Sequence, residues 1–130
     1  MHPVGLFRLA ASTADVYKFE INMAAGNYSH ITEVKNPHVV SNYLKRLLRE
    51  MKDPLIPFRQ YTAYGELKDL EEEEKIMCIK QLIRDTDVLR QETLKLLISF
   101  FRDVVAKESI NKMTSYNIAV TTCPCIFRPK

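Results

Sequence analysis

The chain has 130 residues, of which 46% are hydrophobic and 27% charged, and its formal net charge is only +3. This size and composition are typical of a single globular domain spanning residues 1–130. The small net charge excludes bulk electrostatic attraction as the basis of function, so any cationic role requires local clusters of basic residues. There is no apolar run long enough to cross a bilayer, no signal-peptide pattern and no disulfide framework among the three cysteines. These features favour a cytoplasmic protein.

The first expected helix covers about residues 13–25. Ser12 followed three residues later by Asp15 is a variant of the capping box, with the acid where Glu or Gln is usual. Gly26 stands where a left-handed residue commonly ends a helix. Residues 27–36 are then expected to form a loop.

A second helix is expected from Pro37 to about Met51. Asn36 is a favourable N-cap, and proline in the first turn leaves the helical hydrogen bonds intact. The apolar side chains of this segment fill one arc of the helical wheel and should face the core. They are Val40, Tyr43, Leu44, Leu47, Leu48 and Met51.

The middle of the chain contains prolines that interrupt helical structure. Residues 52–58 should therefore form an extended or turn segment, with Leu55 and Ile56 packed inward. A short helix is possible over residues 59–64. The segment 71–84 begins with four consecutive glutamates, which favour a helix N-terminus. The side chains expected on its buried face are Ile76, Ile79, Leu82 and Ile83.

Two further helices complete the expected fold. The longest covers about residues 89–106, and its apolar residues are spread so widely that we expect burial around much of its circumference. They are Leu94, Leu97, Phe101, Val104 and Val105 near one face, with Leu96 and Phe100 widening it. The last helix begins at the N-cap Thr114, with Met113 and Ile118 spaced as a hydrophobic staple, and ends near Pro124. No convincing strand pattern occurs, so the predicted fold class is all-α.

Several kinds of site are missing from the sequence. The three glycines form no phosphate-binding loop, so the chain should not bind a nucleotide by itself. Cys123 and Cys125 form a C-x-C pair without the usual zinc spacing, and we expect them to be structural rather than metal ligands. No nucleophile or metalloprotease motif occurs. We therefore expect no metal and no cofactor of its own, which argues against a self-contained hydrolase.

A stripe of basic residues lies opposite the apolar arc of the second helix. Lys45, Arg49 and Lys52 recur at i, i+4 and i+7, so their side chains project in one direction. Such a stripe is commonly a solvated face. It is also suited to an acidic protein surface or to a phosphate.

Two other polar residues stand beside apolar anchors. In Gly5-Leu6-Phe7-Arg8, the two apolar side chains should enter the core and leave Arg8 on a loop, pre-organised for an anion. A plain surface arginine is the alternative. Asn117 falls in the first turn of the last helix, where its amide could bridge backbone groups or meet a partner.

Together, and in this order, these motifs resemble the Rho GTPase-activating (RhoGAP) domain family. The finger motif of that family corresponds to Gly5–Arg8, a second motif to Leu44–Pro57 and a third to Asn111–Ala119. The resemblance covers essentially the whole chain. It implies an all-α, RhoGAP-like helical bundle, truncated at both ends so that the outer N- and C-terminal helices are lacking.

The resemblance also implies roles for individual residues. Arg8 corresponds to the catalytic arginine finger that is inserted into the active site of a GTPase. Lys45 and Arg49 are expected to support the finger loop and the GTPase interface, and Asn117 to contact the partner near its switch region. The implied partner is a Rho/Rac-type small GTPase in its GTP-bound form, which carries GTP and Mg²⁺. The chain would be an activator rather than an enzyme, with no nucleic acid partner and with membrane contact only indirectly, through the GTPase.

Two other functions are compatible with the sequence. The first is a non-catalytic RhoGAP-like module that binds a GTPase without activating it. The second is a basic helix that seats the domain on anionic lipid or nucleic acid. The acidic run 71–74 and the small net charge weigh against the second of these.

Overall fold

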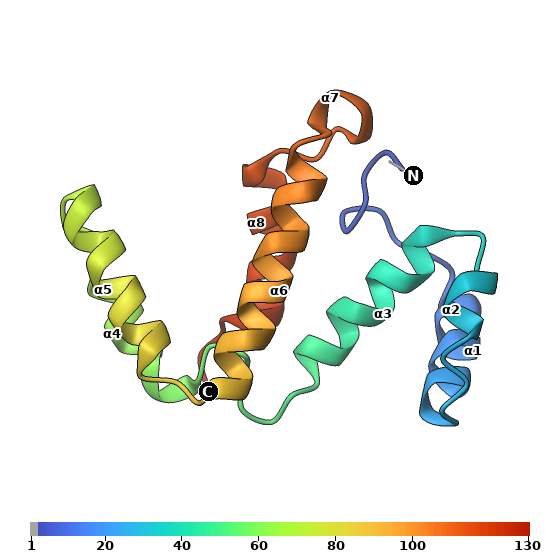
Figure 1. Cartoon of the computed structure of the whole chain (residues 1–130), viewed down its shortest axis with the longest axis horizontal. Helices are drawn as coiled ribbons and strands as arrows, with labels where there is room; N and C mark the ends of the chain where they lie inside the picture. The colour runs from blue at the N-terminus through green and yellow to red at the C-terminus, as the bar shows by residue number, and fades with distance from the viewer. Residues whose placement is uncertain (1–2) are drawn as a thin grey trace.

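The computed structural model of the chain describes residues 3–130, and this part of the chain contains helices and no strands (Figure 1). In chain order the elements are α1 (Thr13–Ala24), α2 (His30–Glu33), α3 (Pro37–Arg49), the short 3-10 helix η1 (Phe58–Gln60), α4 (Tyr61–Gly65), α5 (Glu72–Arg84), α6 (Val88–Val105), α7 (Glu108–Asn111) and α8 (Ser115–Ile126). The all-α prediction is confirmed. No helix of the described residues has both the length and the apolarity needed to span a membrane.

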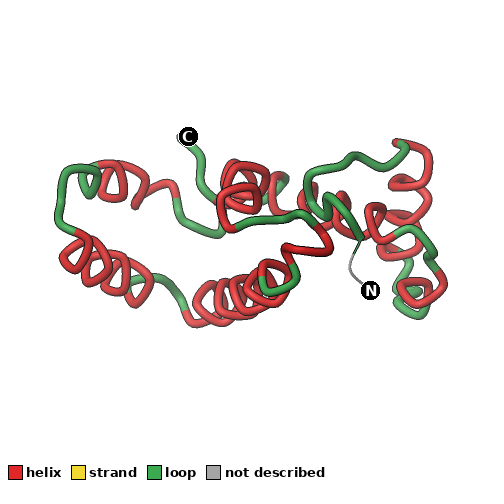
Figure 2. The backbone as a smooth tube through the Cα atoms, turned by 90° about the horizontal axis from the view of Figure 1, so that it is seen from above, coloured by secondary structure: helices red, strands yellow, loops and turns green. Residues whose placement is uncertain are grey.

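The helices form three groups that lie side by side. Helices α6 and α8 occupy the centre, with α3 packed against α8, while α1 and α2 lie on one flank and α4 and α5 on the other (Figures 1 and 2). The N-terminal segment passes near the α7 end of the central pair before it enters α1. The flanking helices therefore lie on either side of the centre, and most of the core lies between α3, α6 and α8.

The helix starts follow from local capping. Three N-cap side chains accept hydrogen bonds from backbone N–H groups in the first turn, which satisfies donors that have no partner inside the helix. These bonds join Ser12 Oγ to the Asp15 N–H at 3.1 Å, Asn36 Oδ1 to the His38 N–H at 3.0 Å, and Thr114 Oγ1 to the Asn117 N–H at 3.1 Å. Gly26 follows α1 with φ of 80°, as a left-handed residue at a helix end should.

The core consists of two apolar clusters. The larger cluster joins the N-terminal loop to α3, α6 and α8, and its buried members are Phe7, Leu48, Leu55, Leu97, Phe101, Val104, Met113, Ile118, Cys125 and Ile126. The smaller cluster joins α1 to α3 and contains Val16, Phe19, Met23 and Val39. The staple pair Met113 and Ile118 is buried as predicted. Helix α3 contributes to both clusters and so connects the N-terminal flank to the centre.

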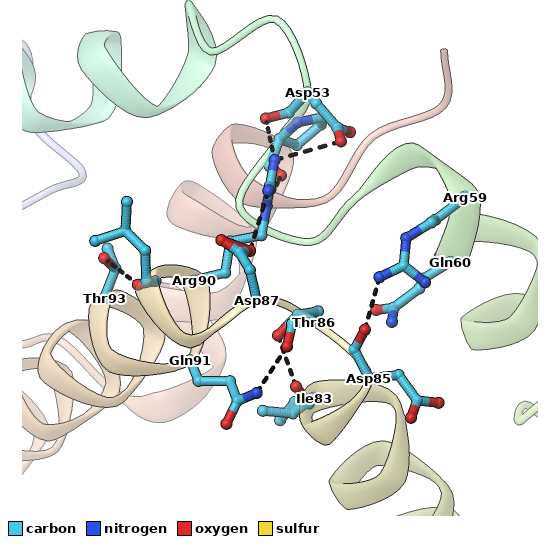
Figure 3. A network of polar contacts seen from close by, with 12 residues as sticks. Asp53, Arg59, Gln60, Ile83, Asp85, Thr86, Asp87, Arg90, Gln91 and Thr93 are labelled. Carbon is cyan, nitrogen blue, oxygen red and sulfur yellow. Dashed lines mark hydrogen bonds and ion pairs between the residues drawn. The ribbon is translucent and has the colours of Figure 1, made fainter.

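A polar network joins the extended segment after α3 to the start of α6 (Figure 3). The Arg90 guanidinium donates to the carbonyl oxygens of Asp53 and Pro54, both at 3.2 Å, and pairs with the carboxylates of Asp53 and Asp87. Next to it, Arg59 donates to the Asp85 carbonyl oxygen at 2.7 Å. These bonds fix the turn between α5 and α6 to the proline-rich segment.

Two short helices are absent from the sequence prediction. The sequence predicts a loop over residues 27–36, but α2 forms one turn there, where Thr32 Oγ1 donates to the Ser29 carbonyl oxygen at 2.8 Å. Helix α7 is also a single turn, and it is followed by the left-handed residue Lys112, whose φ is 63°. One turn contains too few residues to show a helical period, so neither helix produces a pattern.

The last helix is longer than predicted. The sequence predicts an end near Pro124, but α8 continues through this proline to Ile126. Proline removes the hydrogen bond to the carbonyl four residues earlier, which belongs to Val120. Val120 is 55% exposed and Pro124 is also exposed, so water can reach the unpaired carbonyl. The helix therefore tolerates the proline.

Burial is overestimated by the apolar periodicity. The expectation that α6 is buried around much of its circumference is wrong, because Leu96 is 73% and Phe100 45% exposed. Helix α5 has no buried residue, and Ile76, placed on its buried face, is 45% exposed. Leu47 in α3 is 47% exposed. Periodicity shows which side chains share a face, but packing partners decide whether that face is covered. Figure 1 shows α4 and α5 apart from the central pair α6 and α8.

Candidate functional site at the arginine loop

The loop that carries Arg8 has an unusual backbone. Gly5 and Phe7 both have φ of 72°, and the Gly5 carbonyl oxygen accepts the N–H groups of Arg8 and Leu9, both at 2.8 Å. A left-handed conformation is readily adopted by glycine, but it costs a residue with a Cβ roughly 1–2 kcal/mol. The conformation of Phe7 must therefore be held by its surroundings.

Burial of the Phe7 side chain offsets this strain. The ring is 2% exposed and packs edge-on against Phe101, with centroids 5.3 Å apart, and against Phe100 at 5.9 Å. Burying a phenylalanine side chain contributes roughly 1.5–3 kcal/mol, which is similar to or larger than the backbone cost. The aromatic anchor thus keeps the loop in a conformation that an isolated chain would leave.

Helix α3 holds the loop by two hydrogen bonds. Lys45 Nζ donates to the Phe7 carbonyl oxygen at 2.8 Å, and Asn42 Nδ2 donates to the Leu9 carbonyl oxygen at 3.0 Å. The two donors are three residues apart, so they lie on the same face of the helix. The residues on both sides of Arg8 are therefore attached to one rigid element.

The other end of the loop is attached to Asn111, at the end of α7. The Asn111 carbonyl oxygen accepts the Gly5 N–H at 2.8 Å. Its side chain is buried, donates to the Val104 carbonyl oxygen at 2.7 Å and accepts the Met113 N–H at 2.8 Å. Because these bonds orient the Asn111 peptide, they also fix the point from which the loop starts.

The Arg8 side chain folds back over its own loop and remains exposed to solvent. Within residues 3–130 the structure records no hydrogen bond or ion pair for its guanidinium group. A Cβ built on Gly5 would lie 3.4 Å from Arg8 Nη2, so the guanidinium lies close to its own loop. The arrangement presents a permanent cation on a main chain that is fixed at Gly5, Phe7 and Leu9.

The environment of Lys45 makes its ammonium group lose its proton more readily than that of an ordinary lysine. Burial lowers the pKa of Lys45 below the usual value of 10.5, and the neighbouring Arg49 contributes in the same direction, while the Cys125 thiol acts against both. The hydrogen bond to Phe7 is thus made by a partly desolvated donor. Desolvation strengthens such a bond because less water competes for the carbonyl oxygen.

The other two predicted site residues make no hydrogen bond to the loop in the described part of the chain. Arg49 is exposed in the last turn of α3, one turn beyond Lys45. Asn117 is half-buried in the first turn of α8, where its Nδ2 lies 3.4 Å from the Lys112 carbonyl oxygen, a long contact. The structure therefore attaches Lys45 to Phe7, the residue before Arg8, and leaves Arg49 and Asn117 as separate groups on α3 and α8.

The sequence prediction did not identify two residues that hold the loop, Asn42 and Asn111. Asn42 stands three residues before Lys45, a spacing that places both on one face of α3. Spacing alone does not show which face meets a loop 33 residues away. Asn111 belongs to the third motif, but its contact with Gly5 depends on a chain reversal that no local pattern records.

Other candidate sites are weaker. An apolar groove of about 520 Å³ lies between α6 and α8, but its lining contains none of Arg8, Lys45, Arg49 and Asn117. Within residues 3–130 no group of three or more potential ligands is placed to hold a metal ion. Burial raises the pKa of the Cys123 thiol, which disfavours the thiolate that a metal would need.

Comparisons with known proteins agree on one family. A family model for the RhoGAP domain matches residues 1–130. The chain is 28% identical over 128 residues to Rho GTPase-activating protein gacY and 32% identical over 134 residues to gacR, both from Dictyostelium discoideum. Each match covers 97% of this chain but only 18% and 17% of the relative. The chain thus spans less than a fifth of the length of these relatives.

Solved structures show the same fold. The chain matches human Rho GTPase activating protein 15 with a TM-score of 0.86 at 23% identity, over 98% of this chain and 62% of that one. It matches the BH domain of Graf, the GTPase regulator associated with focal adhesion kinase, with a TM-score of 0.85 at 22% identity, over 99% of this chain and 71% of that one. At these identities the likeness concerns the arrangement of the helices.

Proposed function

Because this chain belongs to the RhoGAP domain family, we propose that it accelerates GTP hydrolysis by a Rho-family small GTPase. In this proposal Arg8 is supplied in trans as the catalytic arginine finger. The partner is the GTP-bound form of a Rho- or Rac-type GTPase, which brings both GTP and Mg²⁺. In this proposal the nucleotide site belongs to the partner, and the chain acts as an activator of another protein's reaction.

The observation that carries the proposal is the contrast between the Arg8 side chain and its main chain. The side chain is exposed and has no recorded partner in the described residues, whereas its loop is bonded at Gly5, Phe7 and Leu9. A fixed main chain reduces the entropy lost when the guanidinium engages an anion. An arginine that served only solubility would need no such frame.

The chemistry of phosphoryl transfer explains what the guanidinium can do. As the γ-phosphoryl group leaves, negative charge develops on the transferred group and on the leaving oxygen, and a positioned arginine stabilises it. A finger supplied in trans raises the rate by roughly 10³ to 10⁵. Since the cation is always protonated, it needs no proton transfer to act.

Arg49 and Asn117 are proposed to belong to the contact surface for the GTPase. Arg49 is exposed on the same helix as Lys45, where a cation can meet an acidic surface. Asn117 lies in the first turn of α8, and the long contact of its amide leaves donor capacity for a partner. Neither role requires contact with the finger loop.

The proposal is tested by single-turnover GTP hydrolysis across a panel of Rho- and Rac-type GTPases, with the wild-type chain and Arg8→Ala at saturating concentrations. We expect the wild type to accelerate hydrolysis by at least one of them. Arg8→Ala should remove roughly 10³-fold or more of the acceleration while binding to the GTP-loaded form is largely kept, because the finger acts mainly in the transition state. No acceleration of any GTPase by the wild type contradicts the proposal.

The same experiment separates the alternative function. A chain that binds the GTP-loaded GTPase tightly but leaves the hydrolysis rate unchanged is a non-catalytic binding module. If Arg8→Ala weakens binding and rate equally, Arg8 is an interface anchor rather than a finger. Both results leave the family and the fold intact and change only the role of the loop.

A further inference from the structure

We propose that Asn42 is a positioning residue for Arg8, acting on the finger through the carbonyl group of Leu9. The inference rests on the proposed function, because it concerns the orientation of the arginine that acts in trans. Its basis is the pair of hydrogen bonds from α3 to the loop, at 3.0 Å from Asn42 to Leu9 and at 2.8 Å from Lys45 to Phe7.

The two bonds bracket the finger. They engage the carbonyl oxygen of the residue before Arg8 and that of the residue after it. With only one bond, the peptide on the far side of Arg8 could rotate and swing the long side chain through a wide arc. With both, the Cα of Arg8 is held between two fixed peptide groups. Asn42 therefore holds the peptide group after Arg8, whereas Lys45 holds the one before it.

The orientation of the Asn42 amide follows from its neighbours. Its Nδ2 group donates to the Leu9 carbonyl oxygen and to the His38 carbonyl oxygen at 2.7 Å, one turn earlier in α3. Both partners are acceptors, so the NH₂ group and not the carbonyl oxygen must face them. The bond to His38 fixes the side-chain rotamer and directs the second N–H at the loop.

The local structure beyond the finger also depends on this bond. The loop must turn from Leu9 to the N-cap Ser12, where α1 begins. Ala10, whose N–H belongs to the same peptide group as the Leu9 carbonyl, is exposed and gives no packing anchor. The hydrogen bond from Asn42 thus takes the place of an apolar contact at a position where the chain has none.

Three variants isolate this role. Asn42→Ala removes the donor, and alanine suits the interior of a helix, so α3 should be kept. Asn42→Asp keeps the shape but turns a carboxylate towards two carbonyl oxygens, and it should have the larger effect. Asn22→Ala is the control: Asn22 makes the same bond to a carbonyl one turn earlier, to Lys18 at 2.9 Å, and its Oδ1 accepts from Asn27 Nδ2 at 3.1 Å, but no bond joins it to the finger loop in the described residues.

The decisive measurement uses the GTPase that the wild type stimulates most. We expect Asn42→Ala to lower the saturating single-turnover rate by roughly tenfold or more, because small displacements of a catalytic group are costly. Its affinity for the GTPase loaded with GDP and aluminium fluoride should fall by a similar factor, while the affinity for the form loaded with a non-hydrolysable GTP analogue stays within about threefold. The melting temperature should match that of Asn22→Ala.

A second measurement needs no GTPase. In NMR spectra of the isolated chain, Asn42→Ala should shift the backbone amide of Ala10 and increase the picosecond–nanosecond mobility of Arg8, whereas Asn22→Ala should leave both unchanged. Unchanged signals at both positions would overturn the proposed bracket directly.

The outcomes separate the two proposals. If the wild type stimulates no GTPase, the proposed function fails and the positioning role fails with it. If the wild type stimulates and Asn42→Ala equals it in rate, only the positioning role is overturned. Equal losses in rate, in affinity for the GTP-analogue form and in melting temperature would also overturn it, because they would show that Asn42 supports the fold or the interface as a whole.

Discussion

Lys45 Nζ lies 2.8 Å from the carbonyl oxygen of Phe7, a residue held at φ of 72° by its buried ring. The bond and the aromatic anchor act on the same residue from two directions, one from α3 and the other from α6. Strained backbone at a candidate functional site persists only where the surroundings determine it more than once. Arg8 is the next residue in the chain, so the contacts that hold Phe7 also position the main chain of Arg8.

The first prediction concerns Gly5, whose backbone has φ of 72°. A Cβ at this position would lie 2.7 Å from Leu9 Cγ, so Gly5→Ala adds a steric clash to the backbone strain. Gly26→Ala is the control, since Gly26 has φ of 80° and a Cβ added there would meet no atom within 4 Å. We expect about 1–2 kcal/mol of destabilisation for the control and about 1 kcal/mol or more beyond it for Gly5→Ala. Urea unfolding measures both.

A third variant identifies the source of the excess. Leu9→Ala removes the side-chain atoms that would clash with the new Cβ. Adding Gly5→Ala to the Leu9→Ala variant should therefore lower the free energy of unfolding by less than adding Gly5→Ala to the wild type does. If Gly5→Ala and Gly26→Ala cost the same free energy of unfolding, the close contact with Leu9 has no energetic consequence.

The second prediction concerns the titration of Lys45. Burial disfavours its ammonium form, so in the folded chain it should lose its proton below the usual pKa of 10.5. Between the folded and unfolded pKa values the unfolded chain binds more protons, so this group makes the free energy of unfolding rise with pH across that interval. The penalty is fully present below the folded pKa and is relieved above it. The ¹³Cε shift of labelled Lys45, followed against pH, gives the folded midpoint.

The same signal in concentrated urea is the reference for this titration, and Lys45→Met assigns it. A folded midpoint equal to or above the midpoint in urea would contradict the prediction. As the proton is lost, the bond to Phe7 changes from a charge-assisted to a neutral one, which is roughly half as strong. We therefore expect the loop amides near Phe7 to become more mobile over the same pH range.

The third prediction concerns Arg90, which joins α6 to the proline-rich segment. Its guanidinium makes bonds at 3.2 Å to the carbonyl oxygens of Asp53 and Pro54 and to the Asp87 carboxylate. Arg90→Lys keeps the charge but cannot reach these acceptors together, and we expect a loss of about 1–2 kcal/mol in the free energy of unfolding. Arg59→Lys is the control, because the exposed Arg59 has one recorded bond, to the Asp85 carbonyl oxygen, and should change stability by less than about 0.5 kcal/mol. If urea unfolding shows that Arg90→Lys and Arg59→Lys lower the free energy of unfolding equally, the planar geometry of the Arg90 guanidinium is unimportant.

The parts of the fold that were predictable from the sequence are those with a local cause. Ser12, Asn36 and Thr114 each cap a helix by a bond to a residue two or three positions away, so the residue type and its place in the chain are enough to identify them. The membership of Arg8 and Lys45 in one site was implied by the family resemblance. The physical connection, a bond from Lys45 to the Phe7 carbonyl oxygen 38 positions earlier, is visible only in the folded chain.

The contacts that the sequence did not predict depend on which elements meet. The bond from Asn42 to Leu9 spans 33 positions, and that from Gly5 to Asn111 crosses most of the chain. No periodicity or motif specifies such pairs, because they result from the packing of α3, α6 and α7 around one loop. The degree of burial is equally non-local, as the exposed Leu96 shows.

The last prediction tests this point on two adjacent leucines of α6. Leu97 is 8% exposed and belongs to the larger core cluster, whereas Leu96 is 73% exposed although the sequence places it on a widened buried face. Leu97→Ala should lower the free energy of unfolding by about 2–5 kcal/mol, since it removes packed atoms and leaves a cavity. Leu96→Ala should change it by less than about 0.5 kcal/mol, because the side chain already contacts water and alanine is a good helix former. Both variants make the same substitution in adjacent residues of one helix, so their urea unfolding curves compare the burial of the two side chains directly. If Leu96→Ala lowers the free energy of unfolding by more than about 2 kcal/mol, this face of α6 is covered in solution.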